Sequence, residues 1–265
     1  MSTGSPAVGH VAPAADRRPV LSGGRTISAT VLGVGALTVL AAVLRFYGIG
    51  HQGFWFDEAN SALLVRASPG RMLALIKDTE STPPLYYCIA WVWERLFGDG
   101  EAGLRSLSAL AGTAVVPVAY AAGARLVSRR AGLITAALTA CSPLLIWYSQ
   151  EARSYELLVL LSALGLLAFA HARADPSPRL IGAWAAASAL ALTTHYYAVV
   201  AIVPEAILLL AAHRRRRAVQ VAVAVGSSSG WRWCRSRWPR TRPATTAGSP
   251  PPRCTCAWPR SSPSS

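Results

Sequence analysis

Long apolar runs separated by short basic segments make up most of the chain. The first run, Ile27–Tyr47, is as long as the roughly 20 residues that a helix needs to cross a bilayer. Hydrophobic residues make up 52% of the sequence and charged residues only 14%, whereas soluble domains carry roughly 25% charged residues. The pattern predicts an all-α membrane protein that crosses the bilayer several times. The later apolar runs are Thr82–Phe97, Ala102–Ala124, Ala131–Tyr148, Tyr155–Ala170, Leu180–Val200 and Val200–Ala212.

The basic segments predict how these helices are oriented, because cytoplasmic loops carry an excess of Arg and Lys. If the run Thr82–Phe97 crossed the membrane, every later Arg cluster would lie on the opposite side from the basic N-terminus. If that run is an interfacial or re-entrant helix within one large external loop, residues 48–101, all the clusters lie inside. We therefore expect a multi-pass protein of the plasma (inner) membrane with a cytoplasmic N-terminus. The predicted membrane helices are Ile27–Tyr47, Ala102–Ala124, Ala131–Tyr148, Tyr155–Ala170, Leu180–Tyr196 and Tyr197–Ala212.

The two ends of the chain differ in composition from the transmembrane module, residues 26–225. Residues 1–25 are rich in Gly, Pro, Ala and Ser, which predicts a disordered cytoplasmic N-terminus. A seventh apolar helix begins near Ala218, but residues 226–265 change abruptly to Ser, Pro, Arg, Trp and Cys. One interpretation is a basic tail that touches anionic headgroups. The interpretation that we favour is a shifted reading frame that truncates a longer protein. The net charge of +14 comes mostly from the Arg clusters between apolar runs, so we expect no nucleic-acid partner.

Polar residues suited to chemistry occur in three segments that this topology places outside the membrane. Asp57 and Glu58 follow the first membrane helix, Glu151 and Arg153 lie between the third and fourth, and His195 lies at the outer end of the fifth. A carboxylate there could act as a general base toward a hydroxyl, and a guanidinium could bind a phosphate through two N–H groups. Simpler roles remain open. Asp57 could cap a helix, Glu151 could pair with Arg153, His195 could be structural, and Arg105 could extend toward the headgroups.

Five short motifs in the same order resemble those of family 39-type glycosyltransferases. This group is similar to protein O-mannosyltransferases and to the transferases that attach aminoarabinose to lipid A, all of GT-C architecture. The resemblance covers about residues 30–212, and Thr82 stands where many relatives have a His. The motifs are Phe54-Trp55-Phe56-Asp57-Glu58, Pro83-Pro84-Leu85-Tyr86-Tyr87, Leu96-Phe97-Gly98-Asp99-Gly100-Glu101 with Leu104-Arg105, Tyr148-Ser149-Gln150-Glu151-Ala152-Arg153-Ser154-Tyr155 and Thr194-His195-Tyr196-Tyr197.

The resemblance implies a GT-C-like N-terminal transmembrane module that moves a sugar from a polyprenyl-phosphate carrier to an extracytoplasmic hydroxyl on a protein, lipid or glycan. It implies that Asp57 is the base, or an acid that faces a metal, and that Glu58 is the adjacent acid. A divalent metal ion is a candidate cofactor, with Asp57 and Glu151 as its candidate ligands. The residues expected to bind the donor phosphate or substrate are Arg153, Glu151, Arg105, His195 and Tyr155.

Two other functions fit parts of the pattern. A transporter or a protein that binds a lipid carrier would also contact membrane lipid, but transporters usually place polar residues near the bilayer midplane on broken helices. Here the acids lie at helix ends and no internal repeat is visible. The third interpretation is an inactive, truncated fragment of the transferase.

Overall fold

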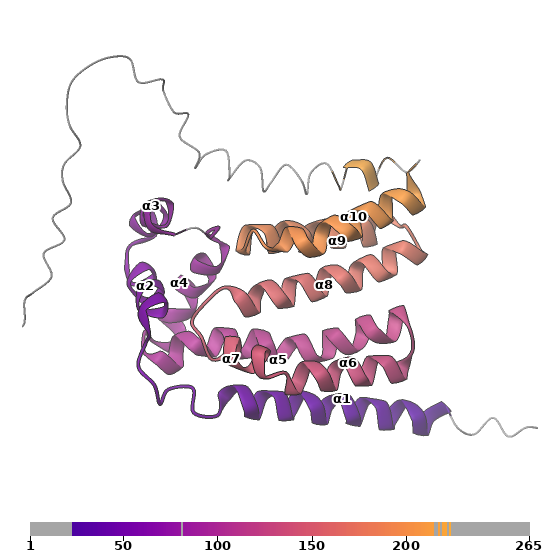
Figure 1. Cartoon of the computed structure of the whole chain (residues 1–265), viewed down its shortest axis with the longest axis horizontal. Helices are drawn as coiled ribbons and strands as arrows, with labels where there is room; N and C mark the ends of the chain where they lie inside the picture. The colour runs from indigo at the N-terminus through magenta and orange to yellow at the C-terminus, as the bar shows by residue number, and fades with distance from the viewer. Residues whose placement is uncertain (1–22, 81, 215–216, 218, 222, 224–265) are drawn as a thin grey trace, which may run out of the picture.

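The computed structural model describes residues 23–80, 82–214, 217, 219–221 and 223. Its described residues form helices, turns and loops without a strand (Figure 1), which confirms the all-α prediction. Residues 1–22 of the predicted disordered N-terminus, half of the seventh apolar run (218, 222, 224 and 225) and the tail 226–265 lie outside the described residues. Residues 23–25, also expected to be disordered, begin α1 instead. The helices are α1 (Gly23–Phe46), α2 (Phe56–Arg66), α3 (Pro69–Thr79), α4 (Leu85–Phe97), α5 (Glu101–Leu126), α6 (Arg129–Cys141), α7 (Pro143–Ser149), α8 (Tyr155–Ala174), α9 (Pro178–Thr194) and α10 (Ala198–His213).

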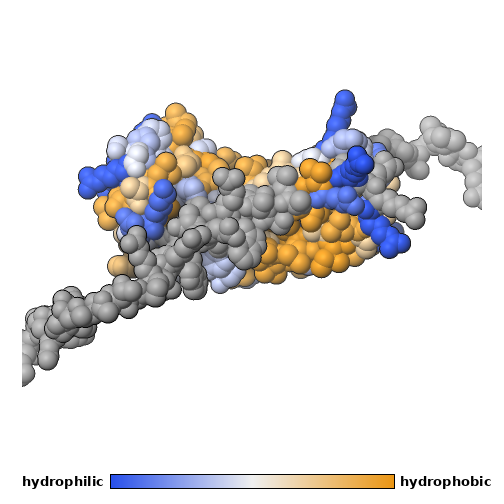
Figure 2. Space-filling view, turned by 90° about the horizontal axis from the view of Figure 1, so that it is seen from above, coloured by the Kyte–Doolittle hydropathy of each residue, from blue (hydrophilic) through white to orange (hydrophobic). Residues whose placement is uncertain are grey.

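The long helices lie side by side as an up-and-down bundle, with α1 on one edge and α9 and α10 on the other (Figure 1). Three of them, α1, α5 and α8, are long and apolar enough to cross a membrane, and the bent pair α6–α7 makes a fourth if it counts as one span. Helices α9 and α10 have 17 and 16 residues and pack beside α8. A band of apolar side chains lies between two more polar ends (Figure 2), as a membrane-embedded bundle requires.

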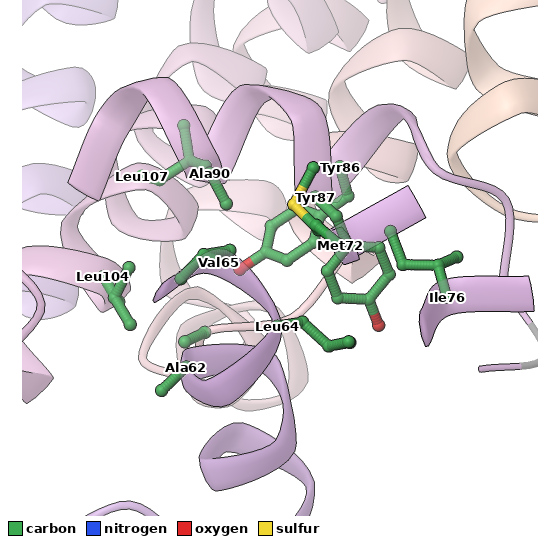
Figure 3. Close-up of a cluster of buried hydrophobic side chains, with 11 residues drawn as sticks. Ala62, Leu64, Val65, Met72, Ile76, Tyr86, Tyr87, Ala90, Leu104 and Leu107 are labelled. Carbon is green, nitrogen blue, oxygen red and sulfur yellow. The ribbon is translucent and has the colours of Figure 1, made fainter. Parts of the chain in front are cut away.

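The predicted external loop folds into three short helices at one end of the bundle. Helix α4 has 13 residues, is not among the candidate spans and lies next to α2 and α3 (Figure 1). The sequence predicted this helix but not α2 or α3. All three are held by one apolar cluster that includes Val65, Met72, Ile76 and the side chains of Tyr86 and Tyr87 (Figure 3). This cluster fixes the start of α2, where Asp57 and Glu58 lie, relative to the bundle.

The predicted continuous helix Ala131–Tyr148 is wrong, because the structure breaks it at Ser142 and bends it by 55°. Pro143 begins α7; a proline lacks an N–H and clashes with the carbonyl four residues earlier. The carbonyls of Thr139 and Ala140 instead accept hydrogen bonds from Arg45 at 2.9 and 3.1 Å. Arg45 is fully buried in α1, so the break in one helix is satisfied by a charged side chain of another.

Candidate functional site

Four connections meet at the end of the bundle that carries α2–α4 (Figure 1). They are the segments between α1 and α2, between α3 and α4, between α7 and α8, and between α9 and α10. The residues that the sequence singled out lie in or beside these connections, except for Arg105, which lies near the start of α5 at the same end. We call this end the acid-lined end, after the carboxylates Asp57, Glu58, Glu80 and Glu151.

Glu58 and Arg105 form a buried ion pair at the base of the acid-lined end. Arg105 donates from Nε and Nη2 to the two carboxylate oxygens of Glu58 at 2.8 and 2.6 Å. Its other N–H groups donate to the carbonyls of Ile49, Gln52 and Gly53 at 2.7 to 3.1 Å. A guanidinium has five N–H donors, and these contacts use them all.

Glu58 also ties this pair to the connection between α7 and α8. Its Oε1 accepts from the backbone N–H of Ala152 at 2.8 Å, and its Oε2 accepts from the backbone N–H of Trp55 at 3.4 Å. Glu58 is fully buried and Arg105 is 5% exposed. The two residues therefore join α2, α5 and the α7–α8 connection, and Arg105 has no N–H left for a phosphate.

Asp57 precedes Glu58 but has a different environment. It lies in the first turn of α2 and is half-buried. Among the described residues its carboxylate oxygens have no hydrogen-bond or ion-pair partner, while its backbone carbonyl accepts from Arg153 Nη1 at 3.3 Å. The start of a helix stabilises a negative charge, because unpaired backbone N–H groups gather there. The backbone of Asp57 is thus held in place, while its carboxylate oxygens remain available to a substrate.

Arg153 contacts the backbone of Asp57. Its Nη1 also lies 3.4 Å from Ser61 Oγ and 3.7 Å from Glu80 Oε1, and its guanidinium lies 6.0 Å from the centre of the Tyr155 ring. The expected pairing of Arg153 with Glu151 is not among the ion pairs of the described residues, since Arg153 pairs with Glu80 instead. The contacts to α2 and Glu80 use one terminal nitrogen, so a phosphate can compete for the other N–H groups.

Glu80 is a member of the site that sequence reasoning missed. It is 6% exposed, accepts a hydrogen bond from Asn60 Nδ2 and lies 3.5 Å from the Thr82 hydroxyl. Thr82, which stands where relatives have a His, also lies 3.5 Å from the Tyr87 hydroxyl. The sequence did contain a signal, because Glu80 is an acid three positions before the paired prolines Pro83 and Pro84. It was missed because the two residues before it in α3 are exposed polar residues.

Glu151 is buried in the α7–α8 connection with half of its carboxylate unpartnered. Its Oε1 accepts from Trp147 Nε1 at 2.6 Å, and its Oε2 has no hydrogen-bond partner among the described residues. Burial raises the pKa of Glu151 above its ordinary value, although the bond from Trp147 opposes this shift; the nearby Glu58 raises the pKa further. Glu151 therefore takes up a proton more readily than an exposed glutamate does.

His195 lies among aromatic rings beside Arg153. It is 3% exposed, and its Nδ1 accepts from the backbone N–H of Tyr197 at 3.1 Å. Its ring centre is 4.5 Å from that of Tyr196, 4.8 Å from that of Tyr197 and 5.8 Å from that of Tyr155. Burial and the charge of Arg153 lower the pKa of His195. The side chain is therefore neutral at pH 7, with its proton on Nε2.

A family model described as dolichyl-phosphate-mannose-protein mannosyltransferase matches residues 81–238. The chain belongs to this family. Its members are membrane glycosyltransferases that use a lipid-linked sugar donor, which agrees with the apolar bundle and the cluster of loops at one end. No curated protein matches the sequence significantly.

The family match covers only part of the candidate site. Arg153, Glu151, Arg105, His195 and Tyr155 lie within the matched residues, whereas Asp57 and Glu58 precede them. The membership therefore places the chain among lipid-dependent glycosyltransferases without assigning a role to Asp57. The contact between Arg153 Nη1 and the Asp57 carbonyl links the unmatched segment to the matched one.

A metal ion was one candidate for the acid-lined end, with Asp57 and Glu151 as ligands. No group of three His, Cys, Asp or Glu residues in the described part of the chain comes together closely enough to hold a metal ion. The predicted ligands Asp57 and Glu151 therefore have no third residue of these types beside them in the described part of the chain. Their role toward a metal stays a prediction, and the steps below are assigned to side chains alone.

Proposed function

We propose that the acid-lined end binds a polyprenyl-phosphate-linked sugar and transfers the sugar to a hydroxyl group of an extracytoplasmic protein, lipid or glycan. The observation that carries the proposal is the juxtaposition of Asp57 with Arg153. The Asp57 carboxylate has no partner among the described residues, and the backbone carbonyl of the same residue accepts a hydrogen bond from the Arg153 guanidinium. A base and a phosphate-binding cation from two distant segments thus share one small region.

The reaction needs one proton acceptor and one cation. The acceptor oxygen attacks the anomeric carbon of the sugar, a new C–O bond forms, and the bond from that carbon to the phosphate oxygen breaks. The polyprenyl phosphate leaves with the electron pair, and the acceptor proton passes to the Asp57 carboxylate. Charge builds up on the departing phosphate, where the N–H groups of Arg153 stabilise it.

The other predicted site residues take supporting roles in this proposal. Glu58 and Arg105 are positioning residues, because Arg105 uses every N–H on protein partners and Glu58 joins Asp57's helix to the connection that carries Arg153. This revises the expectation that Glu58 is catalytic and that Arg105 binds the donor phosphate. Glu80 orients Arg153. Glu151 interacts electrostatically with Glu58, Arg153 and Asp57, and we assign its Oε2, which has no hydrogen-bond partner among the described residues, to substrate binding.

The tyrosines near His195 complete the proposed site. Tyr155 lies between His195 and the Arg153 guanidinium, and Tyr197 stacks on His195 while being 58% exposed. Aromatic faces of this kind suit the apolar face of a sugar ring as well as lipid headgroups. We place the acid-lined end on the extracytoplasmic side, because the opposite end carries the Arg clusters of the chain.

The test is a transferase assay on membranes that contain the full chain, with a radiolabelled polyprenyl-phosphate mannose as donor. Asp57→Asn keeps the size and polarity of the side chain but removes the base, so we expect transfer to fall by about a hundredfold or more. Asp78→Asn is the matched control, because Asp78 is an exposed acid on α3 at the same end. Full activity of Asp57→Asn would contradict the assignment of the base.

A further inference from the structure

A cavity lies at the opposite end of the bundle from the candidate site. It has a volume of about 260 Å³ and is lined by Thr30, Val31 and Val34 of α1, Tyr120 of α5 and Arg129 of α6. On α5, Tyr120 lies 15 residues after Arg105, which is roughly 22 Å along a helix that rises 1.5 Å per residue. The cavity is therefore separate from the acid-lined end.

The chemistry of the cavity has two parts. Its apolar lining residues are Val31 and Val34, and its polar lining residues are Thr30, Tyr120 and Arg129. Arg129 is exposed and has no hydrogen-bond or ion-pair partner among the described residues. An apolar lining together with an unpaired guanidinium matches a molecule with a phosphate group on a hydrocarbon chain.

The face of α6 next to Arg129 shows where a hydrocarbon chain would run. Residues three and four apart share one face of a helix, so Arg130, Ile134 and Leu138 form one line. Ile134 is 61% exposed and Leu138 is 69% exposed, and Arg130 is exposed above them. On the adjoining face, Leu133 Cδ2 lies 3.6 Å from the point where a side chain at Gly33 of α1 would begin. The two helices are therefore in close contact beside the cavity.

The charge of this end identifies the kind of lipid. The described residues there include seven exposed arginines and one carboxylate, Asp175. Such a field attracts an anionic headgroup and repels the positive group of a zwitterionic one. We call this end the basic end; its arginines are Arg125, Arg129, Arg130, Arg173, Arg179, Arg214 and Arg217.

We propose that the cavity between α1, α5 and α6 binds an anionic phospholipid, with its phosphate at Arg129 and Arg130 and an acyl chain along Ile134 and Leu138. Basic pockets between transmembrane helices on the cytoplasmic side bind acidic lipids in this way. The site is independent of the transferase reaction, since it uses none of the residues of the acid-lined end. It gives the bundle a lipid preference in the leaflet that borders the basic end.

The experiment is native mass spectrometry of the full chain, extracted in detergent and mixed with dioleoyl phosphatidylglycerol or dioleoyl phosphatidylcholine. We expect the chain to retain phosphatidylglycerol in preference to phosphatidylcholine. Arg129→Gln should lower the apparent affinity for phosphatidylglycerol about fivefold, the contribution of one basic residue near an anionic surface. Arg179→Gln removes the same charge from the same end but outside the cavity, and should change retention by much less.

A second variant tests the cavity without changing charge. Val34→Trp fills the apolar part of the cavity and should reduce phosphatidylglycerol retention even though all the arginines remain. Equal losses of phosphatidylglycerol retention in Arg129→Gln and Arg179→Gln would overturn the proposal. They would show that the lipid responds to the total charge of the basic end and not to the cavity. Equal retention of the two lipids would overturn it as well. Displacement of the lipid by inorganic phosphate at millimolar concentration would also overturn the proposal, because the cavity would then recognise phosphate without the acyl chain.

Discussion

The two ends of the bundle use charge in opposite ways. At the acid-lined end Glu58, Glu80, Arg105 and Glu151 are each at most 7% exposed. Glu58, Glu80 and Arg105 make hydrogen bonds to residues 20 or more positions away, and Glu151 accepts one from Trp147, four positions earlier. At the basic end the arginines are exposed, and Arg125, which lies 3.4 Å from His171 Nδ1, is an exception in having a protein partner.

The difference shows which charges the fold itself holds in place. Burying a charge costs several kcal/mol, so a buried charge persists only where partners are positioned for it. Such partners cost conformational freedom, and they fix the geometry that chemistry needs. Exposed arginines keep their hydration and adapt to whatever phosphate lies nearby. This difference underlies our two proposals, a reaction at the acid-lined end and lipid binding at the basic end.

The largest effect expected from this contrast is on stability. Arg105→Gln leaves Glu58 buried without its cation, which should lower the free energy of unfolding by about 3–5 kcal/mol. Removing an exposed arginine at the basic end, as in Arg179→Gln, should change the same quantity by less than about 0.5 kcal/mol. Thermal unfolding in detergent measures both, and equal effects would remove the distinction between the two ends.

An intermediate effect is expected on transfer. Arg153→Lys keeps a positive charge but loses the two-pronged N–H arrangement that binds a phosphate, so we expect transfer to slow by about 10- to 100-fold. The matched control is Arg66→Lys, since Arg66 is an exposed residue at the same end that pairs with Asp99 at 2.9 Å. A lysine variant as active as the parent would show that Arg153 supplies charge alone.

The smallest effect is a pH dependence of stability from Glu151. Its pKa in the folded protein is raised by burial, so above the unfolded pKa of about 4.3 the folded state binds more protons than the unfolded state. The stability contribution of the group is therefore present at low pH and is lost as pH rises through the folded pKa. Glu151→Gln should remove this decline.

Unfolding temperatures of the parent and of Glu151→Gln, measured between pH 4.5 and pH 7.5, report the difference directly. The glutamine oxygen can still accept the hydrogen bond from Trp147 Nε1. The two proteins therefore differ mainly in one titrating group. Parallel pH profiles for the two proteins would mean that Glu151 stays ionised in the folded state.

The sequence predicted the long helices well, because an apolar run of membrane-spanning length has few other uses. From the positions of distant arginines it predicted that α4 is an interfacial or re-entrant helix of one external loop. In the structure α4 is not among the candidate spans, and its position relative to the membrane stays a prediction. It did not predict the break between α6 and α7, although Pro143 marks the position. The apolar run continues across the break, so hydropathy does not reveal it. The carbonyls freed at the break are satisfied by Arg45 of α1, a contact that the sequence does not show.

The candidate site was predicted as a set of residues but not as a set of contacts. Glu58 and Arg105 lie 47 positions apart, and nothing in either motif indicates that they pair with each other. The same is true of Arg153 and Glu80, whose meeting depends on how α2–α4 pack on the bundle. Local motifs indicate which residue types gather at one end, whereas tertiary packing decides which of them remain available to a substrate.

The most direct test separates binding from chemistry at Asp57. A single-turnover experiment loads the full chain with radiolabelled polyprenyl-phosphate mannose, measures the bound donor, and then follows transfer after a hydroxyl acceptor is added. We predict that Asp57→Asn binds the donor as the parent does and transfers the sugar about a hundredfold or more slowly. Unchanged transfer by Asp57→Asn, or a loss of donor binding that accounts for the whole defect, would contradict its role as the base.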